Sequence, residues 1–302
     1  MMRVLITGAT GFIGWQCLPL LIQNGCEVHA VSIDSPERAV DDCGVHWHQL
    51  DLLDPVQVAS LMSRVQPTHL LHFSWYAVPG KFWSSSENLR WVQASLSLMQ
   101  NFSANGGKRI VMAGTCAEYD WNYGYCSEYI TPLAPTTVYG ASKHAVQVIL
   151  RTYAEQVGLS VAWGRIFFLY GPREHPIRLV ASVIQSLLKN ETARCSHGNQ
   201  FRDFLHVQDV GAAFVALLLS NVVGTVNIAS GQPVSLKDVI LGIADQLNAR
   251  DLVQLGVIPT SPTDPPLLVA NTRRLNEEVG WHPTYDLDTG LTHTIEWWRK
   301  RI

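Results

Sequence analysis

A tyrosine and a lysine lie four residues apart in the segment Tyr139-Gly-Ala-Ser-Lys143. On a helix this spacing places both side chains on one face. A nearby ammonium stabilises a phenolate and lowers the pKa of a tyrosine from about 10, so Tyr139 can exchange a proton with a substrate hydroxyl or carbonyl. The same spacing also occurs in helices as a solvated pair, so its interpretation depends on the residues around it.

A third candidate, Thr115, closely follows the strand expected at Arg109 to Ala113 and can present its hydroxyl to the same oxygen. We therefore expect Thr115, Tyr139 and Lys143 to form one proton-transfer site. Cys116 lies beside Thr115, but no histidine is paired with it locally, and a small buried thiol is the commoner role. We assign Cys116 no chemistry.

The glycine-rich segment Thr7-Gly-Ala-Thr-Gly-Phe-Ile-Gly14 follows an expected strand and opens an expected helix. Glycines in this context let backbone amides and a helix N-terminus approach a pyrophosphate. The spacing predicts a nicotinamide dinucleotide site, at which Tyr139 and Lys143 also contact the cofactor. The other residues expected to line it are Gly8, Thr10, Gly11, Phe12, Ile13, Gly14 and Phe73.

The end of the second strand decides which dinucleotide is favoured. An acid that holds the adenosine ribose is expected about 20 residues beyond the last glycine. Ser32 stands near that place, with Asp34 slightly later. Ser32 with Arg38 nearby tolerates a 2′-phosphate whereas Asp34 repels one, so NADP is slightly favoured and NAD stays open.

Short β-branched runs alternate with longer amphipathic stretches from residue 3 to about 168, which predicts a doubly wound, Rossmann-type α/β parallel sheet. Asp51 and Leu52 end the third strand and can contact the adenine, though Asp51 can equally cap a helix beginning at Pro55. The expected strands are Arg3 to Thr7, Glu27 to Ser32, His46 to Leu50, His69 to Phe73, Arg109 to Ala113 and Ser160 to Phe168. The expected helices include Phe12 to Asn24 and Ala141 to Gln156.

The alternation weakens after residue 168, and the proline-rich segment Pro259 to Pro266 interrupts it further. The segment Phe204 to Ser230 again has a strand, helix and strand pattern. We therefore expect a dinucleotide-binding domain of residues 1–168 plus about 204–230, and a smaller α+β substrate lobe of about 169–203 plus 231–302.

Composition and charge exclude several classes of protein. The net charge of -3 offers no basic surface for nucleic acid. The N-terminus lacks the pattern of a secretory signal, and the longest apolar run, 211–219, is too short to span a bilayer. Six cysteines show neither a C-x-x-C pair nor zinc-ligand spacing. We therefore expect a cytoplasmic protein with reduced thiols and no metal site.

Taken together, the chain resembles the extended branch of the short-chain dehydrogenase/reductase family, whose members mostly act on nucleotide-linked sugars. The resemblance covers nearly the whole chain. Besides the two segments above, it rests on Arg165-Ile-Phe-Phe-Leu-Tyr-Gly-Pro172, Arg202-Asp-Phe-Leu-His-Val-Gln-Asp-Val210, Asn227-Ile-Ala-Ser-Gly231 and Val279-Gly-Trp-His-Pro283.

The resemblance implies a role for each matching residue. Thr115 orients the reacting oxygen, Tyr139 transfers the proton and Lys143 tunes Tyr139. Arg202 contacts the diphosphate of the sugar nucleotide, as its bidentate guanidinium suits, unless it instead pairs with Asp203 or another acid. Family members often form homodimers through the Tyr139 helix, whose apolar residues are compatible both with this and with internal packing.

The chain departs from relatives that remove water across C5 and C6, which carry an acid just after the threonine. Here Cys116 and Ala117 occupy those places, and Glu118 comes one position later. Phe168 replaces an asparagine that contacts substrate in many relatives. The segment Pro259 to Pro266 lacks an arginine that many relatives use to hold the nucleotide.

Three further residues are candidates for substrate contact. Trp75 and Trp83 flank a loop where the family closes over cofactor and substrate, and they either stack on the ligand or fill the core. His175 resembles a histidine that some relatives use as an acid, although most loop histidines are merely solvated.

The leading hypothesis from the sequence is an NADPH-dependent reductase for a nucleotide-linked 4-keto-6-deoxy sugar. The close rival is a nucleotide-sugar 4-epimerase that uses the same three residues and holds NAD tightly. A 4,6-dehydratase and a non-catalytic dinucleotide-binding protein are the less favoured alternatives.

Overall fold

A large parallel sheet forms the body of the computed structural model, which describes residues 1–34 and 44–302. Its seven strands run in the order β11-β7-β5-β4-β1-β2-β3. Their bounds are β1 Arg3–Thr7, β2 Glu27–Ser32, β3 Val45–Gln49, β4 His69–His72, β5 Arg109–Thr115, β7 Ser160–Ile166 and β11 Gly224–Ile228. This arrangement confirms the expected doubly wound α/β fold.

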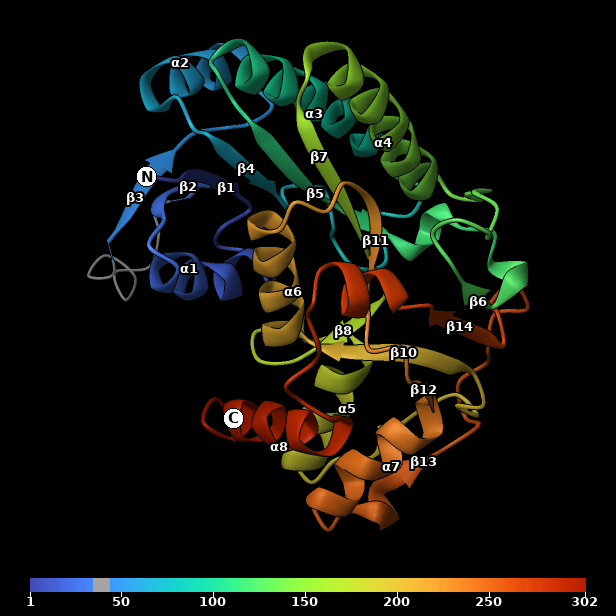
Figure 1. Cartoon of the computed structure of the whole chain (residues 1–302). Helices are drawn as coiled ribbons and strands as arrows, with labels where there is room; N and C mark the ends of the chain where they lie inside the picture. Colours follow the sequence, from blue (N-terminus) through green and yellow to red (C-terminus); the bar gives the residue numbers. More distant parts are fainter. Residues whose placement is uncertain (35–43) are drawn as a thin grey trace.

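Helices cover both faces of this sheet (Figure 1). One face carries α2 (Pro55–Val65), α3 (Glu87–Ala104) and α4 (Val138–Val157), and the other carries α1 (Gly14–Gln23) and α6 (Val207–Leu219). Each face has its own apolar core, because strands buried on both faces present β-branched and aliphatic side chains to both layers. The carboxyl ends of the strands thereby converge on one edge, where open parallel sheets bind ligands.

The ends of the helices follow from their capping residues. The carboxylate of Asp54, rather than that of Asp51, caps α2 by accepting hydrogen bonds from the N–H groups of Val56 and Gln57. The expectation that Asp51 can cap this helix is therefore wrong, because its Oδ1 accepts instead from the N–H of Leu53 within its own turn.

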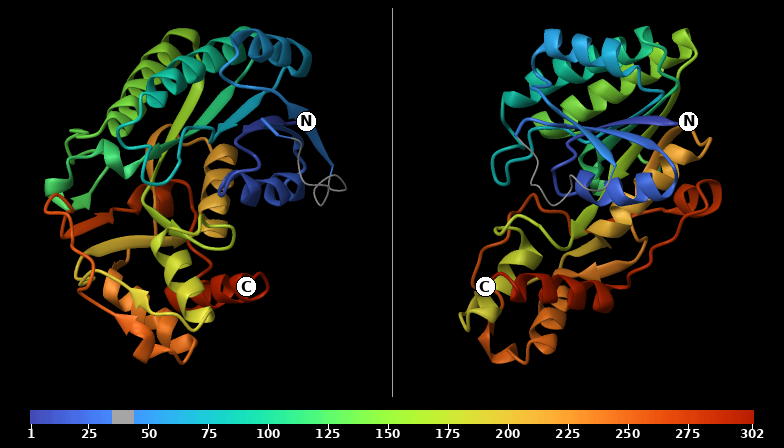
Figure 2. Two further views of the ribbon diagram at one scale, coloured as in Figure 1. Left: turned by 180° about the vertical axis from the view of Figure 1, so that it is seen from behind. Right: turned by 90° about the vertical axis from the view of Figure 1, so that its left-hand side faces the viewer.

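A smaller lobe forms around a second sheet with the order β12-β10-β14-β6, to which β8 adds by pairing with β10. The bounds of these strands are β6 Tyr125–Cys126, β8 Phe168–Tyr170, β10 Phe201–His206, β12 Pro233–Ser235 and β14 Leu267–Ala270. Beyond this sheet lie the helices α5 (Leu179–Leu188), α7 (Leu236–Gln246) and α8 (Leu287–Arg299), and the pair β9 (Ala193–Arg194) and β13 (Val253–Gln254). Figure 2 shows these helices on the side of the lobe away from the large sheet.

Two segments contribute strands to a sheet that the hydrophobic pattern of the sequence did not predict for them. The run expected as one strand from Ser160 to Phe168 is divided, because β7 ends at Ile166 in the large sheet and β8 begins at Phe168 in the small one. The short strand β6 joins the small sheet through β14, although it comes from the first half of the chain.

Among the described residues, no helix combines the length and apolar character required to cross a membrane.

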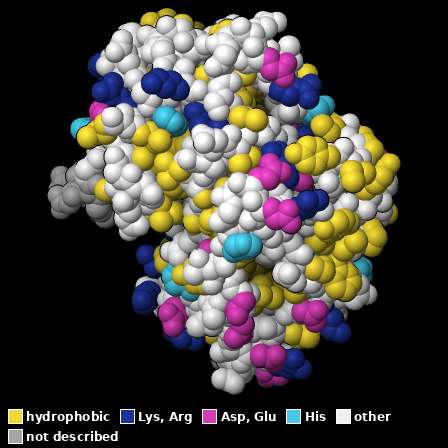
Figure 3. Space-filling model, viewed as in Figure 1, with side chains coloured by type: hydrophobic (Ala, Val, Ile, Leu, Met, Phe, Trp, Pro, Cys, Tyr) yellow, Lys and Arg dark blue, Asp and Glu magenta, His cyan; other side chains and the backbone are white. Residues whose placement is uncertain are grey.

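The surface is more hydrophobic on the side that carries β6 than over the rest of the same face (Figure 3). Hydrophobic side chains gather over the right-hand side of Figure 3, where β6 and β14 lie in the matching view of Figure 1. The exposed apolar residues next to β6 in the chain include Tyr123, Tyr129 and Ile130. Charged side chains of both signs are interspersed over the remainder of this face, in keeping with the small net charge of -3.

Candidate active site

The glycine-rich turn lies between β1 and α1 and brings the backbone into close contact with itself. The N–H of Gly11 donates to the carbonyl of Gly8 at 3.0 Å, and a Cβ at Gly14 would overlap that same carbonyl oxygen. Helix α1 begins at Gly14 with no side chain capping its first amides. The N–H groups of Trp15 and Gln16 already donate to the carbonyls of Gly11 and Ile13, so the features that fit the turn to a dinucleotide pyrophosphate are the positive end of the helix dipole and the close approach that the glycines allow.

The residues expected to hold the rest of the dinucleotide lie at the same edge of the sheet. The hydroxyl of Ser32, at the end of β2, lies 3.4 Å from the hydroxyl of Thr10. Phe73 follows β4 directly, donates its N–H to the carbonyl of Thr7 and packs edge-on against Phe214. Leu52 is buried. Arg38 lies outside the described residues.

Thr115 is held rigidly at the end of β5 by a reciprocal cap. Its hydroxyl accepts from the N–H of Ala117 at 3.2 Å, while its own N–H donates to Oε1 of Glu118 at 2.8 Å. The hydroxyl of Thr115 lies close enough to the phenol of Tyr139 to lower its pKa, against the stronger effect of burial. The structure therefore brings together Thr115 and Tyr139, which come from different layers of the fold.

Tyr139 and Lys143 lie in the first turns of α4, which Thr137 caps by accepting from the N–H of Gly140. Nζ of Lys143 donates to the carbonyl of Ala113 at 2.8 Å and lies 3.9 Å from the centroid of the Trp75 ring. The sequence predicted that Lys143 lowers the pKa of Tyr139, but Lys143 is not among the groups that act on this pKa in the structure. Burial raises the pKa of Tyr139, and the groups that oppose this are Thr115 and Arg178.

Burial lowers the pKa of Lys143, whereas it raises that of Tyr139. It lowers the pKa of Lys143 to about 7, because a buried ammonium loses its hydration, and the charge of Glu118 partly offsets the effect. The site therefore holds a protonated phenol and a lysine whose pKa of about 7 is close to neutral pH.

An aromatic wall leads from Tyr139 towards the small lobe. The backbone N–H of Tyr139 donates to the carbonyl of Trp83, and the Trp83 ring meets the Tyr139 ring edge-on at 5.8 Å. Trp121 in turn meets Trp83 edge-on at 6.1 Å. Trp75 is placed differently, since its ring covers Lys143 and its Nε1 donates to Asn88.

The wall ends at a cleft of about 530 Å³ in the small lobe, a volume that suits a small-molecule ligand. Trp121, Gln200 and Asp264 are among its lining residues. The buried atoms Oε1 of Gln200 and Oγ1 of Thr260 have no hydrogen-bond partner among the described residues. Since both residues line the cleft, a polar ligand there can satisfy groups that the protein alone leaves unpaired.

Arg202 is buried behind this cleft and pairs with Asp264, an acid distant in sequence that lines the cleft. Its Nη2 is 2.6 Å from Oδ1 of Asp264, whose other oxygen accepts from Gln200. Asp203, the neighbouring acid, instead accepts hydrogen bonds from backbone N–H groups, including those of Ser230 and Gly231. Arg202 therefore forms the ion pair considered from the sequence, but with Asp264 and not with Asp203.

Two other expected substrate residues differ in their placement. The ring of Phe168 lies 5.3 Å from the guanidinium carbon of Arg202, because β8 pairs with β10. His175 is exposed, and its Nδ1 accepts from the N–H of Ile177 two residues later. That contact stabilises its own loop.

A family model, described as the NAD dependent epimerase/dehydratase family, matches residues 4–229. The chain belongs to this family. It is 26% identical to UDP-glucuronic acid decarboxylase 1 of Xenopus tropicalis over 99% of this chain and 73% of that protein. It is also 26% identical to UDP-glucuronate 4-epimerase 4 of Arabidopsis thaliana, over 98% of this chain and 75% of that protein.

Solved structures of the epimerase/dehydratase family share the fold. The UDP-glucose 4-epimerase of Thermus thermophilus in complex with NAD superposes with a TM-score of 0.85 at 26% identity, over 100% of both chains. The expectation of an extended short-chain dehydrogenase/reductase is thereby confirmed, and the protein is an enzyme of that family.

Glu118 is the acid considered from the sequence for a dehydratase reaction. Its carboxylate is instead occupied by contacts within the protein core. Its carboxylate is completely buried, accepts from Nε1 of Trp163 at 2.9 Å and pairs with Nε of Arg165 at 2.8 Å. A Cβ on Gly114 would collide with both Trp163 and this carboxylate. Glu118 therefore fixes the end of β5 from within the core, with its carboxylate occupied by Thr115, Trp163 and Arg165.

Sequence reasoning missed Asp264, Gln200 and Trp121 as candidate site residues. Asp264 lies within a proline-rich segment without a local motif, and its partner Arg202 is 62 residues away. Trp121 reaches the cleft only through a short 3-10 turn, Trp121–Tyr123. Only the aromatic and acidic residue types offered a signal, and those types are common in loops.

Proposed function

We propose that this enzyme transfers hydride between a nicotinamide dinucleotide and C4 of a nucleotide-linked sugar. The observation that carries the proposal is the path from the Tyr139 ring along Trp83 and Trp121 to the cleft lined by Asp264, the partner of Arg202. A sugar seated against the aromatic wall presents a hydroxyl or carbonyl to Tyr139. Its nucleotide then occupies the cleft, where the unpaired Oε1 of Gln200 can accept a hydrogen bond and the unpaired hydroxyl of Thr260 can donate or accept one.

The cofactor site proposed for the chain combines the uncapped N-terminus of α1 with the residues at the carboxyl ends of the strands. Bound there, a nicotinamide dinucleotide supplies reversible hydride transfer. The residues assigned to it are Gly8, Thr10, Gly11, Phe12, Ile13, Gly14, Ser32, Asp51, Leu52, Phe73, Tyr139 and Lys143.

Proton transfer is assigned to Thr115 and Tyr139. The phenol oxygen of Tyr139 gives a proton to a substrate carbonyl oxygen, or takes one from a hydroxyl, while the fixed hydroxyl of Thr115 orients that oxygen. Lys143, buried beneath Trp75, supplies a charge close to the reacting centre once protonated. The hydroxyl of Thr115 and the amine of Lys143 are held in place by hydrogen bonds to the backbone, which reduces reorganisation during the reaction.

We infer that 4-epimerisation is the better supported of the two reactions, and this reverses the order expected from the sequence. Support comes from relatives named as 4-epimerases that match nearly the whole chain. Reduction of a 4-keto sugar is the second candidate. It is favoured by Ser32, since a hydroxyl at the end of β2 tolerates the 2′-phosphate of NADP, and a reductase draws on NADPH.

The state of the purified protein separates the two candidates. An epimerase returns its hydride within each turnover and keeps its dinucleotide, whereas a reductase must exchange it. Denaturing the purified enzyme and quantifying released nucleotides by chromatography should give close to one NAD per chain. A protein that carries no nucleotide and oxidises added NADPH with a UDP-linked 4-keto sugar would instead establish the reductase.

A homodimer through α4 remains our proposal for assembly. Val146 is buried in the chain's own core, whereas Val148 and Ile149 are exposed on the same helix. Only the latter two can therefore contact a second copy. Sedimentation equilibrium of the V148E/I149E double variant should show monomers if α4 forms the interface.

A further inference from the structure

Four chemically active side chains gather on one face of the neighbouring strands β2 and β3, away from the candidate active site residues. Glu27 and His29 lie two residues apart on β2, and His46 and His48 two residues apart on β3. The parallel register pairs His29 directly with His46. Because side chains alternate along a strand, all four point to the same face.

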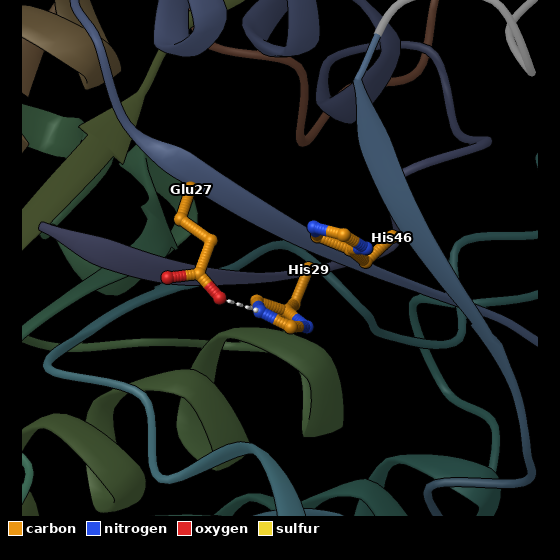
Figure 4. Close-up of side chains that lie close together, drawn as sticks. All are labelled: Glu27, His29 and His46. Carbon is orange, nitrogen blue, oxygen red and sulfur yellow. Dashed lines mark hydrogen bonds and ion pairs between the residues drawn. The ribbon is translucent and has the colours of Figure 1, made fainter. Parts of the chain in front are cut away.

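The contacts within this group bring its nitrogen and oxygen atoms close together. Nε2 of His29 lies 3.0 Å from Oε1 of Glu27, and the rings of His29 and His46 stack with their centroids 4.9 Å apart. One ligand atom from each of Glu27, His29 and His46 falls within 4.8 Å of the others. Figure 4 shows the carboxylate and both imidazoles converging from the two neighbouring strands.

His48 contacts the ring nitrogen of His29 that faces away from Glu27. Its Nε2 lies 2.9 Å from Nδ1 of His29, so it fixes the orientation of the His29 ring and leaves Nε2 directed at Glu27. Metal-binding histidines characteristically hydrogen-bond through their second ring nitrogen in this way. Two positive groups lie nearby, since Nε of Arg3 is 3.1 Å from Oε1 of Glu27 and the charge of Arg64 acts on His48.

We propose that Glu27, His29 and His46 bind one Zn²⁺ ion, with His48 orienting His29 and water completing the coordination. Two imidazoles and a carboxylate form a ligand set that suits zinc. Tetrahedral zinc with bonds of about 2.0–2.2 Å requires ligand atoms about 3.4 Å apart. His46 is exposed, so its side chain is free to close the remaining gap.

The ion would act as a clamp on the edge of the large sheet. Among residues 1–34 and 44–302, β3 is the terminal strand of that sheet and pairs with β2 alone, so a metal held by both strands adds a cross-link at the place where backbone pairing is one-sided. Cysteine spacing could not reveal this site because its ligands are histidines and a glutamate that meet only through strand pairing. Zinc binding at these residues does not depend on the proposed enzymatic reaction.

The test uses the full chain with any affinity tag removed and with metal stripped by a chelator. Isothermal titration with Zn²⁺ should show one ion per chain with micromolar affinity or tighter, and saturating zinc should raise Tm by about 4 °C. The H46Q variant should weaken binding about 10-fold or more, and its metal-free Tm should match that of the wild type because His46 is exposed. The control H282Q, which alters an exposed histidine outside the cluster, should bind as the wild type does.

X-ray absorption at the zinc edge distinguishes this site from other metal-binding groups in the protein. Nitrogen and oxygen ligands at about 2.0–2.2 Å support the proposal, whereas sulfur at about 2.3 Å would place the ion on a cysteine and overturn it. Saturable binding that H46Q and E27Q both leave unchanged would also overturn it, as would the absence of binding below millimolar zinc.

Discussion

The ammonium nitrogen of Lys143 lies 3.9 Å from the centroid of the Trp75 ring and donates a hydrogen bond to the carbonyl of Ala113. Trp75 therefore shields the lysine from solvent. The sequence left open whether Trp75 stacks on a ligand or fills the interior, and this contact favours the interior. A lysine enclosed in this way loses hydration, which explains why its pKa falls to about 7.

This burial makes the stability of the ligand-free protein depend on pH. The pKa of Lys143 is about 7 in the folded chain against an ordinary value of 10.5, so between these pH values the unfolded chain binds the extra proton. Stability relative to the K143M variant should therefore rise with pH by ~1.4 kcal/mol per unit in that window. Urea unfolding of both proteins between pH 7 and 9 measures the difference, and a flat or falling difference would contradict the burial of a neutral amine.

Removing the phenol oxygen of Tyr139 should stop proton transfer without unfolding the protein. We expect Y139F to lower the rate with UDP-linked sugars by about 10² or more, as loss of a general acid–base group does. The matched control is Y153F, which removes the same atom from a partly buried tyrosine on the same helix. Rates measured by chromatography of the sugar nucleotides should separate the two variants, and equal rates would refute the assigned mechanism.

Glu118 should behave as a structural residue. Replacing it in E118Q leaves the buried guanidinium of Arg165 without its carboxylate, so the free energy of unfolding should fall by about 3 kcal/mol. Denaturant titration measures this, with E191Q as a control at an exposed glutamate. A dehydratase acid would give the reverse pattern, in which E118Q retains its stability and loses turnover.

Arg202 should contribute to binding through the fork of its guanidinium. We expect R202K to weaken binding of UDP about 10-fold or more, because lysine keeps the charge but cannot form the bidentate contact. The control R250K alters an exposed arginine paired with Asp245. Calorimetric titration with UDP gives both affinities, and an R202K affinity equal to that of the wild type would remove Arg202 from the nucleotide site.

The sequence by itself determined the features that depend on local geometry. The glycine turn was predicted because its spacing constrains only the backbone between β1 and α1. The shared face of Tyr139 and Lys143 follows from the helical repeat. The order of strands and helices was predictable because burial on two faces gives the strands continuous apolar runs.

Only the tertiary structure decided which distant residues meet. Arg202 pairs with Asp264 across 62 residues, and Glu118 with Arg165 across 47. Trp75 covers Lys143, while Trp83 lies against Tyr139. Each of these contacts depends on how strands and loops from separate segments pack together. Packing also raised the pKa of Tyr139 where spacing alone predicted the opposite, because desolvation depends on every neighbour and not on one residue four positions away.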